Sequence, residues 1–263
     1  MRTQLLAAAA AALIALAPFA ASADDNEPAH QAWSWNGVFG KYDPAQLKRG
    51  FQVYHDVCSN CHSLKLLAYR NLGGDNGIGF SDDEVKKIAA EKQIPDEPND
   101  EGKVVPRPAR PSDRFVSPFE NDNAARASNG GALPPDLSLI TKAREGGPDY
   151  VFAILTGFMF DKDGNPTAPA GVTVTPGKYY NKAFPGNNIG MPPPIAEATL
   201  VTYADGTKNS VDQEARDIVA FLNWAAEPEM NVRHNLGIKV LILAGLLTIL
   251  AYLVKRKVWA DVH

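Results

Sequence analysis

The chain has 263 residues with 45% hydrophobic content, which is enough to bury the core of one generous domain. Its net charge is −4 and no basic patch stands out, which argues against nucleic-acid binding. The chain has two cysteines, which excludes a disulfide-rich scaffold, and twenty prolines with twenty-one glycines indicate much irregular structure.

The first 23 residues have the pattern of a secretory signal peptide. Arg2 precedes an apolar run over residues 5–20, and Ala21-Ser22-Ala23 forms a small-residue cleavage site. A retained membrane helix fits less well, because the run is short, rich in alanine and broken by Pro18. We therefore expect a mature chain that starts at Asp24 and faces the periplasm of a bacterium.

Residues 24–42 are predicted to form an extended arm, which Trp33 and Trp35 anchor on an apolar surface. A helix is then predicted to begin at Asp43-Pro44, because aspartate is a good cap and proline suits the first turn. Apolar residues recur along it at i, i+4 and i+7, so one face is expected to be buried. The helix leads directly to Cys58.

The sequence Cys58-Ser59-Asn60-Cys61-His62 is the attachment motif of a covalent c-type haem, and its single occurrence predicts one haem c. The thiols lie one helical turn apart, so both can reach the vinyl groups on one porphyrin edge. His62 is predicted to bind the iron as the proximal ligand. The alternatives are a thiol oxidoreductase and a metal-binding module that use Cys58 and Cys61, both of which predict free thiols and no red colour.

After the motif, the leucine-rich residues 63–72 are predicted to wall the haem. Ser81 and Glu84 form a capping box for a helix that runs to about Lys92. Residues 75–101, which we call the acidic segment, hold nine acidic and three basic residues, a local charge of −6. Such a segment is either an ordinary solvated face or a surface that steers a basic partner.

Six prolines between residues 95 and 118 predict a long surface loop. A short helix is expected after Pro134-Pro135, ending at Arg144, and another from Pro148 to about Thr156. The stretch that follows is expected to be mostly loop, with a hairpin near Thr199–Thr207.

The last helix of the domain is predicted after Ser210, which forms a capping box with Gln213, and it ends before Pro228. A helix at each end of the domain suits a cytochrome c-type fold, in which the two helices cross beside the haem. We therefore predict a mainly α fold: a haem domain with long irregular insertions, plus one C-terminal transmembrane helix.

Leu236–Val254 is a run of 19 residues with one charge, Lys239. At 1.5 Å per residue it spans roughly 28 Å, about one hydrocarbon core, which predicts a single membrane-spanning helix. Lys255-Arg256-Lys257 then predict a cytoplasmic C-terminus, in agreement with an exported N-terminus. The expected divisions are a signal peptide at 1–23, a periplasmic haem domain at 24–230, and an anchor with a short tail at 231–263, in a bacterial inner membrane.

A second axial ligand would make the haem an electron carrier, and methionine is the ligand that raises its potential. Met191 is favoured because Gly190 lets the backbone approach the porphyrin and three following prolines stiffen the loop. Met159 lies in an apolar run and is interpreted as core packing, while Met230 lies at the membrane edge.

The chain resembles the cytochrome c1 family, the haem-bearing subunit of the ubiquinol–cytochrome c oxidoreductase (cytochrome bc1) complex. The resemblance covers nearly the whole mature chain and is far more specific than the haem motif alone. The segments that carry it, in order, are Arg49–Tyr54, Ala125–Ala127, Asn129–Ser138, Arg144–Phe152, Gly190–Ile195 and Trp224–Glu229, followed by the terminal anchor.

The resemblance implies a site around the haem, with Met191 as the distal ligand. The resemblance implies that some bacterial relatives have an extra disulfide in the region of residues 160–182. No cysteine remains here to form one, so packing or hydrogen bonds must steady the Met191 loop. The implied site residues are Asn129, Ala132, Pro134 and Pro135 lining the haem, Arg144 and Tyr150 at the propionates, and Leu155, Phe184, Ile189 and Pro194 in the apolar shell.

The resemblance also implies a function and partners. The chain would be the electron carrier of a dimeric, membrane-embedded quinol–cytochrome c reductase, bound to cytochrome b, taking electrons from the Rieske iron–sulfur protein. It would pass them to a soluble cytochrome c that docks on the acidic segment. The alternative is a free, membrane-tethered mono-haem cytochrome c serving a terminal oxidase. Such carriers are usually smaller, whereas 128 residues separate His62 from Met191 here.

Overall fold

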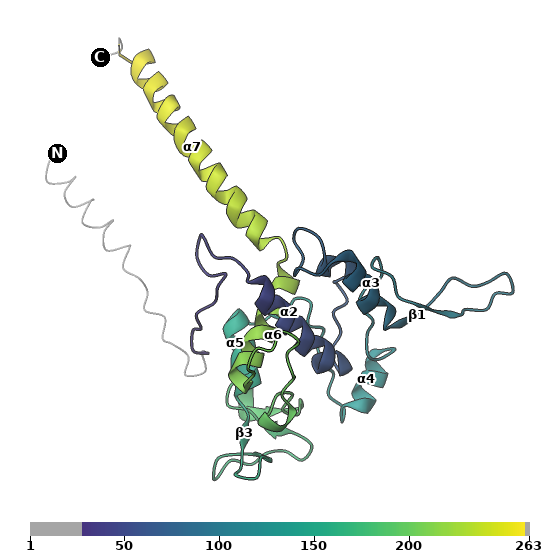
Figure 1. Cartoon of the computed structure of the whole chain (residues 1–263). Helices are drawn as coiled ribbons and strands as arrows, with labels where there is room; N and C mark the ends of the chain where they lie inside the picture. Colours follow the sequence, from purple (N-terminus) through teal and green to yellow (C-terminus); the bar gives the residue numbers. More distant parts are fainter. Residues whose placement is uncertain (1–27, 261–263) are drawn as a thin grey trace.

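The computed structural model describes residues 28–260, so the predicted signal peptide lies outside the described residues. The described chain is mainly α, as predicted (Figure 1). Its α-helices are α2 (Pro44–Asp56), α3 (Asp82–Ala90), α4 (Asp122–Ser128), α5 (Gly147–Thr156), α6 (Val211–Ala226) and α7 (Met230–Val258). Four short 3₁₀ helices are η1 (Cys58–Asn60), η2 (Tyr69–Leu72), η3 (Pro185–Asn187) and η4 (Glu197–Thr199).

The strands are short and form three separate antiparallel pairs. Gln93 pairs with Pro108, Met159 with Thr167, and Tyr179 with Ile189, and each pair lies within a loop region. The strands are β1 (Gln93–Pro95) with β2 (Pro106–Pro108), β3 (Met159–Phe160) with β4 (Pro166–Thr167), and β5 (Tyr179–Tyr180) with β6 (Asn188–Ile189).

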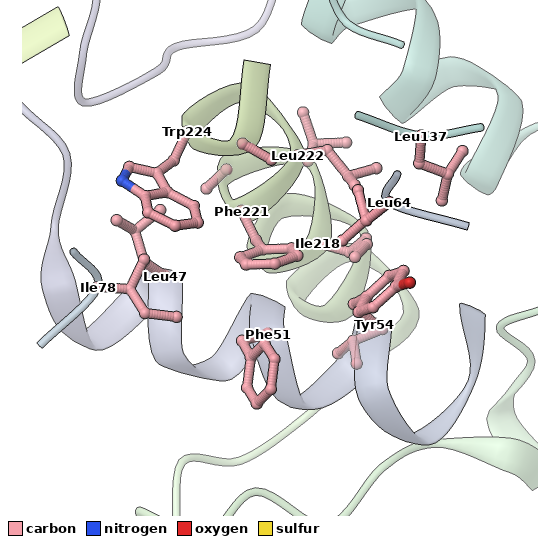
Figure 2. Packing of buried hydrophobic residues seen from close by; sticks show 14 of the residues in the cluster. Leu47, Phe51, Tyr54, Leu64, Ile78, Leu137, Ile218, Phe221, Leu222 and Trp224 are labelled. Atoms are coloured by element: carbon pink, nitrogen blue, oxygen red, sulfur yellow. The ribbon is translucent and has the colours of Figure 1, made fainter. Parts of the chain in front are cut away.

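Helices α2 and α6 cross in direct backbone contact at the centre of the core. A side chain on Gly50 would place its Cβ 2.0 Å from the carbonyl oxygen of Asp217, so only glycine permits this approach. Figure 2 shows Phe51 and Tyr54 of α2 in one cluster with Phe221 of α6, and both ring centroids lie 5.7 Å from that of Phe221. This crossing confirms the expected packing of the first and last helices of the domain.

The helix starts follow the predicted caps. The Asp43 carboxylate accepts a hydrogen bond from the backbone of Ala45, and Ser81 and Glu84 form the complete capping box. Ser210 caps α6 as predicted by accepting from Gln213 N–H, but the Gln213 side chain donates to Asp217 instead of returning to the cap.

The arm before α2 is fastened as its tryptophans predict. Trp33 and Trp35 are buried and stacked, with ring centroids 4.9 Å apart. The indole Nε1 of Trp33 donates to the Asp149 carboxylate at 2.6 Å, and the backbone of Gln31 donates to the same side chain. The arm is therefore tied to the first turn of α5.

Four local predictions were wrong. The segment before Arg144 forms consecutive turns instead of a helix, because Asp136 and Ser138 direct its first hydrogen bonds to residues 63–66. The hairpin near Thr199–Thr207 is replaced by η4 and loop, since the Val201 amide is held by Glu214. The proline-rich loop contains β1 and β2. Met159 is 39% exposed on the β3 edge and does not pack in the core.

Helix α7 is, among the described residues, the one helix long and apolar enough to cross a membrane. It exceeds the predicted run at both ends and begins inside the main core, where Met230 is 2% exposed. His234 Nδ1 lies 2.9 Å from the carbonyl oxygen of Gly40, and Tyr42 N donates to Asn231 Oδ1. The arm before α2 therefore lies beside the base of α7, as Figure 1 shows.

Candidate functional site

The haem-attachment motif forms a tight turn at the end of α2. The amides of Cys61 and His62 both donate to the carbonyl of Cys58, at 3.1 and 2.9 Å, so the two cysteines project from one turn. They form no disulfide, and Cys61 is exposed. Burial, reinforced by the Cys61 and Glu214 charges, raises the pKa of the Cys58 thiol to about 12. A nucleophilic thiol requires a lowered pKa, so this environment disfavours Cys58 as the nucleophile of a thiol oxidoreductase.

The imidazole of His62 is already oriented for one ligand. Its Nδ1 lies 2.8 Å from the carbonyl oxygen of Pro135, which can only accept, so Nδ1 carries the proton. The Nε2 lone pair is left for a metal, the arrangement that fixes ligand histidines in metalloproteins. Burial lowers the pKa of His62, against the opposing effects of Pro135 and Asp136, and so favours the neutral ring that a ligand needs.

Asp136 fastens the His62 loop to the segment that contains Pro135. Its carboxylate accepts from Ser63 Oγ at 2.7 Å, Lys65 N at 2.8 Å and Ser138 N at 2.9 Å. Although burial would raise the pKa of Asp136, these hydrogen bonds hold it below the ordinary value. Asp136 was not among the predicted site residues; its place directly after Pro134-Pro135 in the family motif was the available signal.

The segment that starts at Asn129 connects the two halves of the site. Asn129 Nδ2 donates to Ala125 O at 2.7 Å and closes the end of α4. Farther along, Ala132 lies against the Met191 loop, since a Cβ built on Gly190 would be 3.0 Å from its Cβ. Pro134 is half-buried and Pro135 is exposed. The structure thus places Ala132 beside Gly190, which precedes Met191, and Pro135 beside His62.

Met191 packs in a small apolar cluster separate from the main core. Buried Ile154, Phe158 and Ile189 form its centre, and Tyr150, Phe184 and Met191 pack against it. The cluster therefore gathers four predicted site residues. Two others lie elsewhere: Leu155 is buried in the main core, and Pro194 is half-buried next to Ile195 of that core.

Asn181 steadies the Met191 loop. This fully buried side chain donates to Ile154 O at 2.7 Å and accepts from Ala183 N at 3.0 Å. The backbone carbonyl of Asn181 accepts from Asn187 Nδ2. The loop is thus held to the end of α5 by hydrogen bonds, in the region where no disulfide is available. Sequence reasoning missed Asn181, because no local pattern marks a long-range hydrogen bond.

Arg144 and Tyr150 lie at the entrance to α5. Burial raises the pKa of Tyr150, and the neighbouring Arg144 charge opposes this. Arg144 donates to the carbonyl of Ala143 at 3.1 Å. Their predicted contacts with propionates stay a prediction.

The residues present fit a covalent porphyrin. Two thiols project from one turn, a neutral imidazole offers one free nitrogen, and an apolar cluster with a thioether lies across the Ala132–Gly190 contact. Leu133, between those halves, is an apolar side chain left 36% exposed. A mainly α domain with this motif and a terminal apolar helix defines the class of membrane-anchored cytochromes.

Comparisons with known proteins specify the family. The sequence profile of the Cytochrome C1 family matches residues 33–262, and the chain belongs to this family. It is similar to cytochrome c1 of Rhodospirillum rubrum, with 50% identity over 88% of this chain and 87% of that one. It is also 45% identical to cytochrome c1, heme protein, mitochondrial, of Saccharomyces cerevisiae, over 88% of this chain and 72% of that one.

A third relative carries a different name. It is the cytochrome b-c1 complex catalytic subunit, mitochondrial, of Candida albicans, with 45% identity over 88% of this chain and 76% of that one.

Proposed function

We propose that the chain carries one covalent haem c and is the electron-transfer subunit of a quinol–cytochrome c reductase complex. The observation that carries this proposal is the Cys58–His62 turn, in which His62 commits Nδ1 to Pro135 and keeps Nε2 free. Thioether bonds to Cys58 and Cys61 hold the porphyrin edge, and His62 and Met191 bind the iron. Bound haem supplies one-electron redox chemistry, and no side chain of this protein is required as an acid or base.

The remaining site residues position and shield the haem. Asn129, Ala132, Pro134 and Pro135 line it, while Leu155, Phe184, Ile189 and Pro194 exclude water from the iron, which helps raise its potential. Arg144 offers a planar cation and Tyr150 a hydroxyl to the propionates.

The proposed partners follow from the family. The name of the Candida albicans relative places that protein in a cytochrome b-c1 complex, which supports association of this chain with cytochrome b. The dimeric state of the assembly is proposed from the family resemblance alone. The Rieske iron–sulfur protein delivers one electron, and a soluble cytochrome c removes it. All nine carboxylates of the acidic segment are exposed, as a docking surface for a basic carrier requires.

The proposed topology has one membrane span. Residues 1–23 form the signal peptide, 24–230 the periplasmic haem domain, and 231–263 the anchor and cytoplasmic tail of an inner-membrane protein. The tripeptide Lys255-Arg256-Lys257 lies in the last turn of α7 and supports this orientation under the positive-inside rule.

The first test is a reduced-minus-oxidised spectrum of the membrane-extracted protein with a pyridine haemochrome assay. We expect a c-type α-band that survives acid–acetone extraction and is lost in Cys58→Ala. Met191→Leu should keep the haem and sharply lower its potential, whereas Met159→Leu, an exposed control, should not. A colourless protein with two titratable thiols would refute the haem.

A second test separates the complex from a free tethered carrier. Affinity purification of the full chain from mild detergent should recover cytochrome b with reduced-quinol oxidation activity. Recovery of the red protein alone, with normal haem, would instead support the carrier that serves a terminal oxidase.

A further inference from the structure

A pocket of about 280 Å³ lies where the haem domain meets α7. Its walls come from the arm before α2, the turns before α5, the end of α6 and the first turn of α7. The lining residues that bear on its chemistry are Trp35, Thr141, Lys142, Glu227, Arg233 and His234. None of the proposed haem ligands lines it, so the pocket is separate from the redox site.

The charged residues of the pocket leave one positive charge in excess. Lys142 Nζ lies 2.5 Å from Glu227 Oε2, and Arg233 contacts the other carboxylate oxygen. Although burial would raise the pKa of Glu227, hydrogen bonds from these two cations hold it below its usual value. Glu227 is therefore ionised at neutral pH. Two cations face one anion, and both cationic side chains are more than half exposed, so they have donors left for a second anion.

A polar group in the wall of the pocket also lacks a partner. Thr141 is 3% exposed, and its hydroxyl is buried without a hydrogen-bond partner among residues 28–260. An unpaired buried hydroxyl costs free energy, and native structures retain few of them. A ligand with acceptor oxygens would satisfy this donor.

An exposed apolar loop borders the pocket on the side of α7. Val38 and Phe39 are 61% and 79% exposed, and the loop lies at the base of the apolar helix because Gly40 contacts His234. Asn36 and Gly37 of the same loop line the pocket. Figure 1 shows the arm before α2 beside the first turns of α7. Apolar side chains next to a membrane-spanning helix, with cations behind them, are typical of a membrane interface.

We propose that this pocket binds the phosphate headgroup of an anionic phospholipid in the leaflet next to the haem domain. Lys142 and Arg233 attract the phosphate, Thr141 donates to it, and Val38 with Phe39 lie along the acyl chains. The volume suits a headgroup and not a whole lipid, whose chains stay in the bilayer. The proposal does not depend on the redox reaction.

The test uses the full-length, haem-loaded protein in nanodiscs of phosphatidylcholine with a small fraction of phosphatidylglycerol. Native mass spectrometry after gentle release counts the lipids that stay bound. We expect wild type to retain phosphatidylglycerol in preference to phosphatidylcholine. Lys142→Gln and Arg233→Gln should each reduce this retention about fivefold, as expected for one cation at a lipid surface. Lys162→Gln, an exposed lysine remote in sequence from the pocket residues, should leave it unchanged.

Two further variants separate binding from folding. Lys142→Arg keeps the charge and should restore retention, while Thr141→Val should reduce it without reducing thermal stability in lipid-free detergent. Equal retention by wild type and by both charge-removing variants would overturn the proposal. Displacement of the lipid by millimolar inorganic phosphate would also overturn it, because the site would then be a free-anion site. The proposal would also be overturned if the preference for phosphatidylglycerol disappeared when cytochrome b is bound, because the pocket would then be part of the interface with that protein.

Discussion

Asn181 shows how single buried polar side chains define this protein. Its three hydrogen bonds connect the end of α5 with the loop that leads to Met191, and its side chain fills the space that Gly157 leaves, since a Cβ there would lie 2.6 Å from Asn181 Oδ1. The fixed position of Met191 therefore depends on a residue that binds no cofactor.

We predict that Asn181→Ala destabilises the protein by about 2–3 kcal/mol, because two side-chain hydrogen bonds are lost and the amide of Ala183 loses its acceptor. The absorbance band of the methionine–iron bond should weaken in parallel, as the Met191 loop loosens. Thermal unfolding and the oxidised spectrum would measure both. Asn165→Ala, on an exposed turn, is the control; an unchanged spectrum in Asn181→Ala would show that packing alone holds the loop.

Glu214 is a second buried group with an unusual environment. It is fully buried in α6; one carboxylate oxygen accepts from Val201 N–H, and the other has no partner in the described chain. Burial raises the pKa of Glu214 above its ordinary value of 4.5, against the hydrogen bonds from Val201 and Asn209, and the Asp217 charge adds to the increase.

The raised pKa of Glu214 makes stability depend on pH in a defined direction. Above pH 4.5 the unfolded chain loses this proton first, so the free energy of unfolding falls as the pH rises through the folded pKa. Glu214→Gln removes the titrating group and its buried negative charge beside Asp217, so we predict that it stabilises the protein at pH 7 by about 1–3 kcal/mol, the order of the penalty for an incompletely hydrogen-bonded buried group. It should have no effect near pH 4. Thermal melts between pH 4 and pH 7 would measure this difference, with Glu197→Gln as an exposed control. An equal gain in stability of Glu214→Gln at every pH would contradict the prediction.

At the scale of elements, the α2–α6 crossing dominates the fold. Arg49 on α2 donates through Nε to the fully buried Asp217 at 2.9 Å, directly beside the glycine contact. The ion pair and the close backbone approach therefore fix both the distance and the register of the two helices.

We predict that Gly50→Ala disrupts this crossing. The added methyl would lie within 2.0 Å of the carbonyl oxygen of Asp217, so the helices must separate, at a cost of at least about 3 kcal/mol. Chemical denaturation of the full chain in detergent would measure the loss. Gly237→Ala makes the same change where nothing lies within 4 Å and should be tolerated. Equal stability of the two variants would contradict the structure.

The elements with strong local signals were predictable. Helices α2, α3, α5 and α6 start at the expected caps or prolines, because those signals act within a few residues. Helix α7 contains the expected apolar run but begins before it, at Met230. The short helix α4 was missed, since its seven residues include one buried side chain and lack an apolar period. The turns before Arg144 and the loop after η4 were mispredicted because hydrogen bonds to distant segments determine them.

The candidate site divides in the same way. The attachment turn and His62 follow from adjacent residues, so the sequence alone identifies them. The contacts of His62 with Pro135 and of Gly190 with Ala132 join segments more than fifty residues apart, and only the folded chain shows them. Roles in the haem shell beyond these contacts stay predictions.

At the scale of the whole molecule, the distribution of charge determines which partners the surface attracts. The acidic segment includes α3 and the loop between β1 and β2, which projects from the rest of the domain in Figure 1. On this loop Asp96 pairs with Arg107, whereas Glu97, Asp100 and Glu101 are exposed and can act on a partner at long range.

We predict that neutralising Glu97, Asp100 and Glu101 together slows electron transfer to a basic cytochrome c several-fold at low ionic strength. The difference should vanish in high salt, because screening shortens the Debye length to roughly 10 Å at 0.1 M. Stopped-flow oxidation at a series of salt concentrations would measure it. Neutralising Glu120, Asp122 and Asp163 provides a matched control. Identical salt slopes for both triple variants would assign the acidic segment to an ordinary solvated face.

The junction between α6 and α7 has a mechanical consequence. Three residues separate Ala226 from Met230, which is itself buried, and Glu227 in between contacts both Lys142 and Arg233. This short connection, with contacts on both sides, restricts rotation of the domain about α7. In the proposed complex, the haem would therefore keep a nearly constant height above the membrane, and the partners that exchange electrons with it would have to move to reach it.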